Sequence, residues 1–272
     1  MKIPFFWRRV VGFGILGAFM LALGAEGVFL AFSVFAMGPL PFEDDFASGD
    51  LRAWSPWAQQ ACCAHSKTVA SAPDWPGKNA LRMQIRYGDP KTRNSIRSEL
   101  RLRATDYHVL YEYELKTFIP EDWGFDSIPV LLVQMHNVPD NWKGEWGLPP
   151  PLDLQIVGEE WVLGRAYGPT PNWLQKVTNI EAWAWWKAPL QKGRWSAWVF
   201  RVRWSGGEDG LLEVEKDGVK IATASGPNAY DNLLAPYLKF GVYVPGWSLL
   251  TSPPQVSERT AYFTDVVAKR LP

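Results

Sequence analysis

The sequence predicts an all-β domain, built as a sandwich of two sheets and preceded by an apolar N-terminal helix. From residue 42 onward, short runs of alternating or uniformly apolar residues follow one another along the chain. Turns rich in Gly and Pro separate these runs, and no long stretch shows the 3.6-residue period of an amphipathic helix. Many short strands with little helix are typical of two-sheet folds. No internal repeat or low-complexity linker is visible, so we expect one domain over residues 42–272.

The first 38 residues predict a membrane-targeting segment. Residues 10–38 are apolar except for Glu26, and they follow three basic residues, Lys2, Arg8 and Arg9. This run is longer than the apolar region of about 7–15 residues in a signal peptide, and a membrane span needs about 20 residues. We favour an uncleaved signal anchor over a signal peptide cleaved near Ala22-Leu23-Gly24, and both over a buried core helix. Either targeting segment would place the domain outside the cytoplasm, in the periplasm or at the cell surface.

The expected strands are residues 81–86, 96–103, 108–119, 130–136, 152–157, 195–204, 211–216, 219–224, 237–243 and 261–270. The Asp217-Gly218 pair predicts a hairpin turn, because both residues tolerate positive φ. Residues 229–234 are the one candidate for a short helix. Residues 137–151 and 164–194 are rich in Trp, Pro, Gly and Asn, and we expect them to form long loops over a cleft.

Three of these strands carry polar side chains on the face opposite their apolar one, since alternate strand residues point to opposite faces. In the first, Ile96, Ser98, Leu100 and Leu102 oppose Arg97, Glu99, Arg101 and Arg103. In the second, Leu131, Val133 and Met135 oppose Gln134 and His136. In the third, Leu238, Phe240 and Val242 oppose Tyr237, Lys239 and Tyr243, with Gly241 leaving a gap. If these faces share one sheet, they form a polar cleft suited to an acidic substrate.

Composition excludes one class of partner and suggests another. The 28 basic and 28 acidic residues balance, which argues against nucleic-acid binding driven by bulk charge. Tryptophan is unusually frequent, with 16 residues. Most pack into cores in general, but several lie in irregular stretches, where an exposed ring can stack on a sugar: Trp142, Trp146, Trp173, Trp183, Trp185 and Trp186.

Three strings within the polar strands carry a family resemblance: Arg97-Ser98-Glu99-Leu100, Gln134-Met135-His136, and the run from Tyr237 to Tyr243. In this order they resemble the signature strands of the jelly-roll polysaccharide lyases, which include alginate lyases, glucuronan lyases and heparin lyase I-like proteins. Phe42-Glu43-Asp44-Asp45-Phe46 and the prolines after the second string are more similar to the glucuronan and heparin lyase I branch. The resemblance covers residues 42–272 and implies a β-jelly roll, a concanavalin-like two-sheet sandwich.

The polar residues also match the chemistry of β-elimination. Cleaving a uronic acid polymer in this way removes the C5 proton beside a carboxylate and expels the C4 oxygen, so the enzyme must neutralise the carboxylate and supply a base and an acid. Arg binds a carboxylate through two hydrogen bonds, Gln donates N–H, and His and Tyr transfer protons. This set needs no catalytic metal.

The resemblance implies the same roles residue by residue. Arg97 and Gln134 would hold the carboxylate, His136 would assist neutralisation or act as the base, and Tyr243 would be the proton donor and a second candidate for the base. Substrate-binding positions would be Glu99, which would orient Arg97, together with Arg101, Lys239, Tyr237, Trp142 and Trp146. The expected partner is an acidic polysaccharide, with the membrane as a second partner through the N-terminal segment, and we expect a monomer.

Two other functions stay open from the sequence. A carbohydrate-binding jelly roll without catalysis would keep exposed tryptophans but would not need Gln134, His136 and Tyr243 together. A glycoside hydrolase needs two carboxylates flanking the scissile bond. The available pairs are Glu112/Glu114, Glu159/Glu160 and Glu213/Glu215.

Calcium and the cysteines give two further expectations. Glu43, Asp45 and Asp265 could supply oxygen ligands to a structural calcium ion where the first and last strands meet. Cys62 and Cys63 are the two cysteines of the chain, and adjacent cysteines rarely bridge each other. We therefore expect ordinary strand or loop residues there, with a vicinal or intermolecular disulfide as the lesser alternative.

Overall fold

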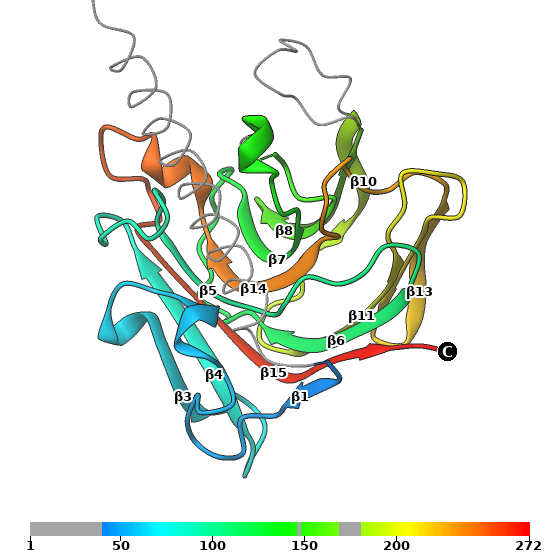
Figure 1. Cartoon of the computed structure of the whole chain (residues 1–272). Helices are drawn as coiled ribbons and strands as arrows, with labels where there is room; N and C mark the ends of the chain where they lie inside the picture. Colours follow the sequence, from blue (N-terminus) through cyan, green and yellow to red (C-terminus); the bar gives the residue numbers. More distant parts are fainter. Residues whose placement is uncertain (1–39, 146–147, 169–180) are drawn as a thin grey trace, which may run out of the picture.

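The computed structural model of the chain describes residues 40–145, 148–168 and 181–272 (Figure 1). The N-terminal segment, and with it the predicted apolar helix, lies outside the described residues, as do Trp146 and Trp173. Within the described part, no helix is both long and apolar enough to cross a membrane.

Two antiparallel sheets form the domain and lie one above the other in Figure 1. The eight-stranded sheet has the order β13 (Val219–Ser225), β12 (Leu211–Lys216), β11 (Trp195–Arg203), β6 (Leu110–Phe118), β15 (Glu258–Arg270), β4 (Asn79–Arg86) and β3 (Lys67–Ser71), with β1 (Phe42–Asp44) paired to β15. The seven-stranded sheet has the order β10 (Glu181–Pro189), β9 (Glu160–Tyr167), β8 (Leu152–Val157), β7 (Val130–His136), β14 (Tyr237–Tyr243), β5 (Arg97–Arg101) and β2 (Gln59–Gln60).

The described helices are single 3-10 turns: η1 (Pro56–Ala58), η2 (Ala64–Ser66), η3 (Asn141–Lys143) and η4 (Pro245–Ser248). The order of strands confirms the predicted all-β jelly-roll sandwich. It also places β7, β14 and β5, the three strands with polar faces, side by side in one sheet.

Large apolar side chains from the two sheets meet between the layers. Trp161 of β9 contacts Trp198 of β11 edge-to-face, with 5.1 Å between the ring centroids. Phe240 of β14 packs on Phe263 of β15, with 5.4 Å between the ring centroids. All four are fully buried. Because one face of each strand fills this core, the opposite face of the seven-stranded sheet is left for polar side chains.

The first half of β7 faces the opposite way from the prediction, because the strand contains a bulge. Leu131, Val133 and Met135 were expected to share the apolar face, but the pairing of β7 with β8 shifts register between Leu131 and Val133. Leu132 and Val133 both join the buried core as a result. The extra residue in a bulge reverses the alternation of side chains locally. The predicted facing is therefore correct from Val133 onward and wrong for Leu131.

Two local expectations about secondary structure are wrong. Residues 164–194 do not form one long loop, because β9 continues to Tyr167 and residues 181–189 form the edge strand β10, whose Trp-rich sequence suits a pleated surface. Residues 229–234 are not helical. Tyr230 instead bridges to Gly168, and the Leu233 N–H donates to the Asp140 carboxylate.

The expectation for the cysteines is also wrong, because Cys62 and Cys63 form a vicinal disulfide. No third cysteine exists in the chain, so the only intrachain partner of each sulfur is the other. The bridge lies between β2 and η2, and the last residue of η2, Ser66, accepts a 2.6 Å hydrogen bond from Ser98 of β5.

Gly241 is required by close packing against β5 rather than by an open gap in the cleft. Its φ is +148°, and an added Cβ would lie 2.1 Å from the Ser98 carbonyl oxygen and 2.7 Å from the Glu99 Cα. The pairing of β14 with β7 also shifts register between Phe240 and Tyr243. Glycine therefore lets β14 lie against β5 while passing a bulge.

We expect Gly241→Ala to lower the free energy of unfolding by about 1–3 kcal/mol, because the overpacked backbone must shift. Urea denaturation would measure the change. Gly206→Ala is the matched control, since its Cβ would meet open space and should change stability by less than about 0.5 kcal/mol. Equal stability of the two variants would contradict the packing role.

Candidate active site

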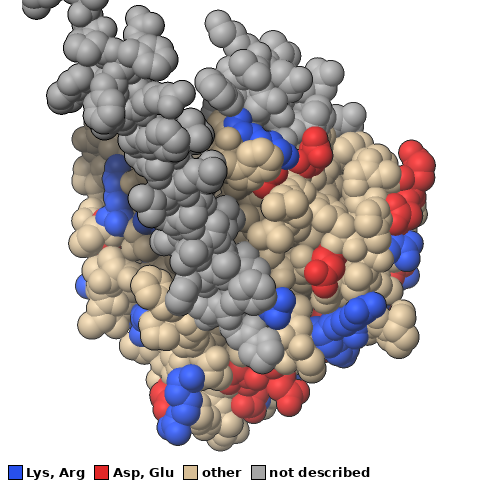
Figure 2. Space-filling view, in the orientation of Figure 1, with Lys and Arg blue, Asp and Glu red and all other residues tan. Residues whose placement is uncertain are grey.

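Strand register brings the predicted catalytic residues to one face of the seven-stranded sheet. Tyr243 of β14 pairs with Arg97 of β5, Lys239 pairs with Gln134 of β7, and Tyr237 pairs with His136. Directly opposed residues project their side chains to the same face. On the molecular face in Figure 2, Lys and Arg groups are interspersed with Asp and Glu groups, in keeping with the balanced charge of the chain.

Glu99 is the centre of this group. Its carboxylate pairs with the Lys239 ammonium at 2.8 Å and with Arg97 Nη1 at 3.2 Å, and it accepts a hydrogen bond from Gln134 Nε2. Its side chain is only 2% exposed. Burial acts to raise the pKa of Glu99, but the charges of Lys239 and Arg97 outweigh it and hold the pKa below its usual value. Glu99 is therefore a fixed anion that orients one donor on each of three strands.

Arg97 retains unused hydrogen-bonding capacity. Its guanidinium lies 4.0 Å from the centroid of the Tyr243 ring, while its Nε is buried and has no partner among the described residues. A buried donor without an acceptor is costly, and a substrate carboxylate would supply that acceptor. The Tyr243 hydroxyl also makes no hydrogen bond with the described residues, which leaves its proton available.

The tautomer of His136 follows from the one hydrogen bond that its ring makes with the described residues. Nδ1 lies 2.7 Å from the carbonyl oxygen of Asn137, which can only accept, so Nδ1 carries the proton and Nε2 of the neutral ring has a free lone pair. Burial, followed by the charge of Lys239, lowers the pKa of His136 to about 4. The neutral imidazole can accept a proton at Nε2 but cannot donate one there, which favours a base over a carboxylate-neutralising donor.

Among the predicted substrate-binding residues, Lys239 and Arg101 are buried, whereas the Trp142 ring is exposed. Lys239 is 1% exposed, and burial lowers its pKa to about 8 despite Glu99. The Arg101 guanidinium is held by the Trp57 carbonyl at 3.0 and 3.2 Å, and the Tyr237 ring lies 5.6 Å from His136. Trp142, on η3, is 56% exposed, and the Lys143 ammonium lies 5.1 Å from the centroid of its ring. Trp146 lies outside the described residues.

Sequence reasoning missed two polar residues on this face. Gln60 of β2 pairs directly with Glu99, and its buried Oε1 has no partner among the described residues. Asp153 of β8 pairs directly with Gln134 and is 6% exposed. The alternation in Leu152-Asp153-Leu154-Gln155-Ile156 was a usable signal for Asp153, whereas the two-residue β2 has no periodic pattern.

The predicted calcium residues meet lysines in the structure. The Lys78 ammonium lies 3.0 Å from Asp45 Oδ2 and 2.7 Å from Asp265 Oδ1, and Lys116 lies 2.8 Å from Asp265 Oδ2. Asp45 Oδ1 accepts from the Ala47 N–H. Glu43 lines the same hollow. Both aspartates thus have donors at every carboxylate oxygen. This arrangement does not fit a calcium ion, which would have to displace Lys78, and the calcium site stays a prediction.

Comparison with known proteins bears on the family and on the fold. A protein-family model described as polysaccharide lyase matches residues 46–267. The solved structure of an endo-β-1,4-glucuronan lyase from the fungus Trichoderma reesei superposes with a TM-score of 0.69 at 18% identity, covering 85% of this chain and 95% of that chain. An alginate lyase from Aplysia kurodai superposes with a TM-score of 0.48 at 15% identity, covering 76% and 87%. A search of curated proteins found no match.

We expect Glu99→Gln to be strongly destabilising, because it leaves two buried cations without their anion. Removing one partner of a buried ion pair typically costs about 3–5 kcal/mol, and urea denaturation would measure it. Glu258→Gln is the matched control, since that carboxylate is half exposed and pairs with Arg86 at the surface, where pairs contribute about 0–1 kcal/mol. A similar small loss in both variants would show that Glu99 does not anchor the site.

We expect His136 to make folding stability depend on pH. Its pKa is lowered from 6.5 to about 4 in the folded protein, so between these values the unfolded chain binds a proton that the folded chain refuses. Its contribution to stability is present at higher pH and is lost as the pH falls through this window. His136→Gln should therefore gain stability relative to the unsubstituted protein as the pH is lowered. Parallel pH profiles of the two urea midpoints would contradict the assignment.

Proposed function

This chain belongs to the polysaccharide lyase family, and from that premise we propose that it cleaves a uronate-containing polymer by β-elimination, with Arg97, Gln134, His136 and Tyr243 at the reacting centre. One observation carries the proposal. Donors for a carboxylate, a neutral imidazole and a phenol hydroxyl come together on three adjacent strands, around a buried anion that keeps the donors oriented. Among the described residues, neither the imidazole Nε2 nor the phenol hydroxyl has a hydrogen-bond partner.

The reaction assigns one step to each group. Arg97 Nε and the second N–H of Gln134 bind the carboxylate at C5, which stabilises the charge that develops when the C5–H bond breaks. His136 Nε2 takes the C5 proton. The C4–O bond then breaks, a C4–C5 double bond forms, and the Tyr243 hydroxyl gives its proton to the leaving oxygen. The Arg97 guanidinium over the Tyr243 ring stabilises the resulting phenolate.

An acidic polymer of 1,4-linked uronate is the substrate class we propose, with glucuronan as the first candidate. The solved glucuronan lyase shares the fold over most of both chains. The charges of this sheet face add electrostatic support, because Arg97, Lys239 and Arg101 outnumber its two buried carboxylates, Glu99 and Asp153. A cleft with excess positive charge attracts anionic chains.

The hydrolase alternative lacks a suitable carboxylate pair among the sequence candidates. Glu112 and Glu114 lie on β6, and Glu213 and Glu215 lie on β12, in the sheet opposite the site. All four are paired with basic residues, namely Arg201, Lys269 and Lys220. Glu159 and Glu160 lie at the β8–β9 turn and pair with Lys192 and Lys187. None of these pairs faces Arg97, His136 or Tyr243.

We also propose that the domain acts outside the cytoplasm, held or delivered there by residues 1–38. A polymer too large to cross a membrane must be cut on the side where it resides. The basic residues before the apolar run of the sequence would keep the N-terminus inside. Protease accessibility of the domain in membrane fractions would test this location.

We expect Tyr243→Phe to lower turnover by about 10²–10⁴-fold, because the ring remains while the leaving oxygen loses its acid. The measurement is ultraviolet absorbance of the unsaturated uronate end, on a panel of glucuronan, alginate and heparin. Binding of the uncut polymer should change little, which separates a chemical role from a packing role. Near-normal turnover by Tyr243→Phe would contradict the assignment, and new reducing ends without unsaturated product would indicate hydrolysis instead.

A further inference from the structure

The face that carries the candidate site continues across three more strands. Paired residues form one row perpendicular to six strands: Arg101, Lys239, Gln134, Asp153, Gly164 and Ala184, on β5, β14, β7, β8, β9 and β10. Neighbouring strands lie about 4.8 Å apart, which is close to the length of one pyranose ring in a polymer. A chain bound along this row would therefore place its next ring beside Asp153 when one ring is held at Gln134.

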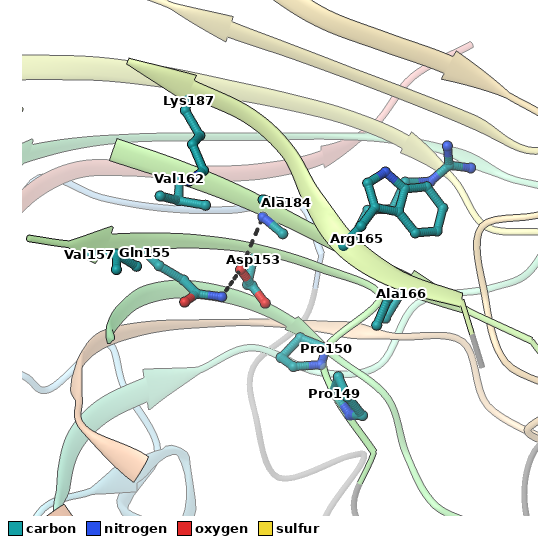
Figure 3. A pocket seen from close by; sticks show the side chains of 13 residues that line it. Pro149, Pro150, Asp153, Gln155, Val157, Val162, Arg165, Ala166, Ala184 and Lys187 are labelled. Carbon is teal, nitrogen blue, oxygen red and sulfur yellow. Dashed lines mark hydrogen bonds between the residues drawn. The ribbon is translucent and has the colours of Figure 1, made fainter. Parts of the chain in front are cut away.

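A hollow of about 380 Å³ opens at that place. Small residues keep it free, because Gly164 and Ala184 continue the row beyond Asp153 and both line the hollow. A Cβ at Gly164 would lie 2.5 Å from the Asp153 carboxylate, so only glycine fits there. Figure 3 shows Asp153 among the lining side chains, between Gln155 and Ala184, with its hydrogen bonds as dashed lines.

The bonding of Asp153 differs from that of Glu99. Asp153 Oδ1 accepts from Gln155 Nε2 at 2.7 Å and from the Gly164 N–H at 3.2 Å. Its Oδ2 receives no hydrogen bond from the described residues, and within that same part of the chain no Lys or Arg forms a salt bridge with it. Burial, only partly offset by these hydrogen bonds, raises the pKa of Asp153 to about 6. At neutral pH it is an acceptor-only group with one free oxygen facing a hollow.

Sugar geometry indicates what such a group would meet. In a diequatorially 1,4-linked polymer, each ring is turned over relative to its neighbour. When one uronate ring presents its carboxylate edge to Arg97 and Gln134, the next ring presents the C2–C3 hydroxyl edge to the same wall. Hydroxyl groups can donate to a carboxylate, whereas a second carboxylate would be repelled at short range in a buried setting.

We propose that the hollow around Asp153 is the subsite for the ring next to the one at the reacting centre, and that Asp153 selects a ring presenting free vicinal hydroxyl groups there. The ligand class is a 1,4-linked uronate polymer without acyl groups at C2 and C3. Acylation removes the donor and adds bulk where the Gly164 and Ala184 floor leaves room for a bare ring edge. This inference rests on the proposed function for the position of the reacting ring.

The test compares one glucuronan preparation in two forms, fully de-O-acetylated and O-acetylated at C2 and C3. Binding is measured by calorimetry in the Tyr243→Phe background, and kcat/KM is measured in the otherwise unsubstituted protein. Asp153→Asn keeps the acceptor for Gln155 and nearly the same shape, so its thermal unfolding should stay close to that of the parent. Asp153→Ala removes both oxygens. Glu114→Gln neutralises a half-exposed carboxylate on the opposite sheet and serves as the charge-matched control.

We expect the parent to bind the free polymer at least tenfold more tightly than the acetylated one. Asp153→Ala should lose about tenfold or more in affinity for the free polymer and should lose the preference for it. The affinity and preference of Asp153→Asn should lie between those of the parent and those of Asp153→Ala. Glu114→Gln should bind both polymers as the parent does. Retention of the full preference by folded Asp153 variants would overturn the inference. Loss of the preference in binding without any unsaturated product would support the subsite and refute the lyase function. Unsaturated product from both polymers at equal kcat/KM would support the lyase and refute the subsite.

Discussion

The whole site depends on a buried carboxylate that is kept ionised by its neighbours. Glu99 is surrounded by a lysine, an arginine and an amide from β14, β5 and β7, and its negative charge compensates the two buried cations. A buried cation without an anion is far more costly than the net gain from the pair. The arrangement therefore does not increase stability so much as fix the directions in which Arg97 and Gln134 can donate to a substrate.

The sandwich supplies this arrangement through register. Arg97, Lys239 and Gln134 are far apart in sequence but become neighbours because β5 and β14, and β14 and β7, pair in one particular alignment. A slip of one residue would turn every one of these side chains into the core. Gly241 allows the close approach that this alignment needs, and the core contacts of Phe240 with Phe263 hold β14 in place from the other side.

Two buried carboxylates on the same face have opposite electrostatic environments. Glu99 is neutralised by two cations and has a lowered pKa, while Asp153 has only uncharged hydrogen-bond donors among the described residues and a raised pKa. The first is suited to organising positive charge under a uronate, and the second to accepting hydroxyl donors from the ring beside it. Glu99 lies on β5 and Asp153 on β8, with β14 and β7 between them, so the two environments occupy different positions along one face of the same sheet.

The sequence by itself determined the fold class, the strands at residues 130–136, 152–157, 211–216 and 237–243, and the polar composition of one sheet face, because alternation with period two is a local property. Tertiary structure decided which strands lie side by side, and so which side chains touch. It decided that Glu99 is shared by three donors, that Lys239 is buried rather than exposed, and that Lys78 lies between Asp45 and Asp265, since each depends on partners distant in the chain. The bulge at Leu131, the pairing of edge strand β10 with β9 and the irregular path of residues 229–234 also depend on contacts with other parts of the chain.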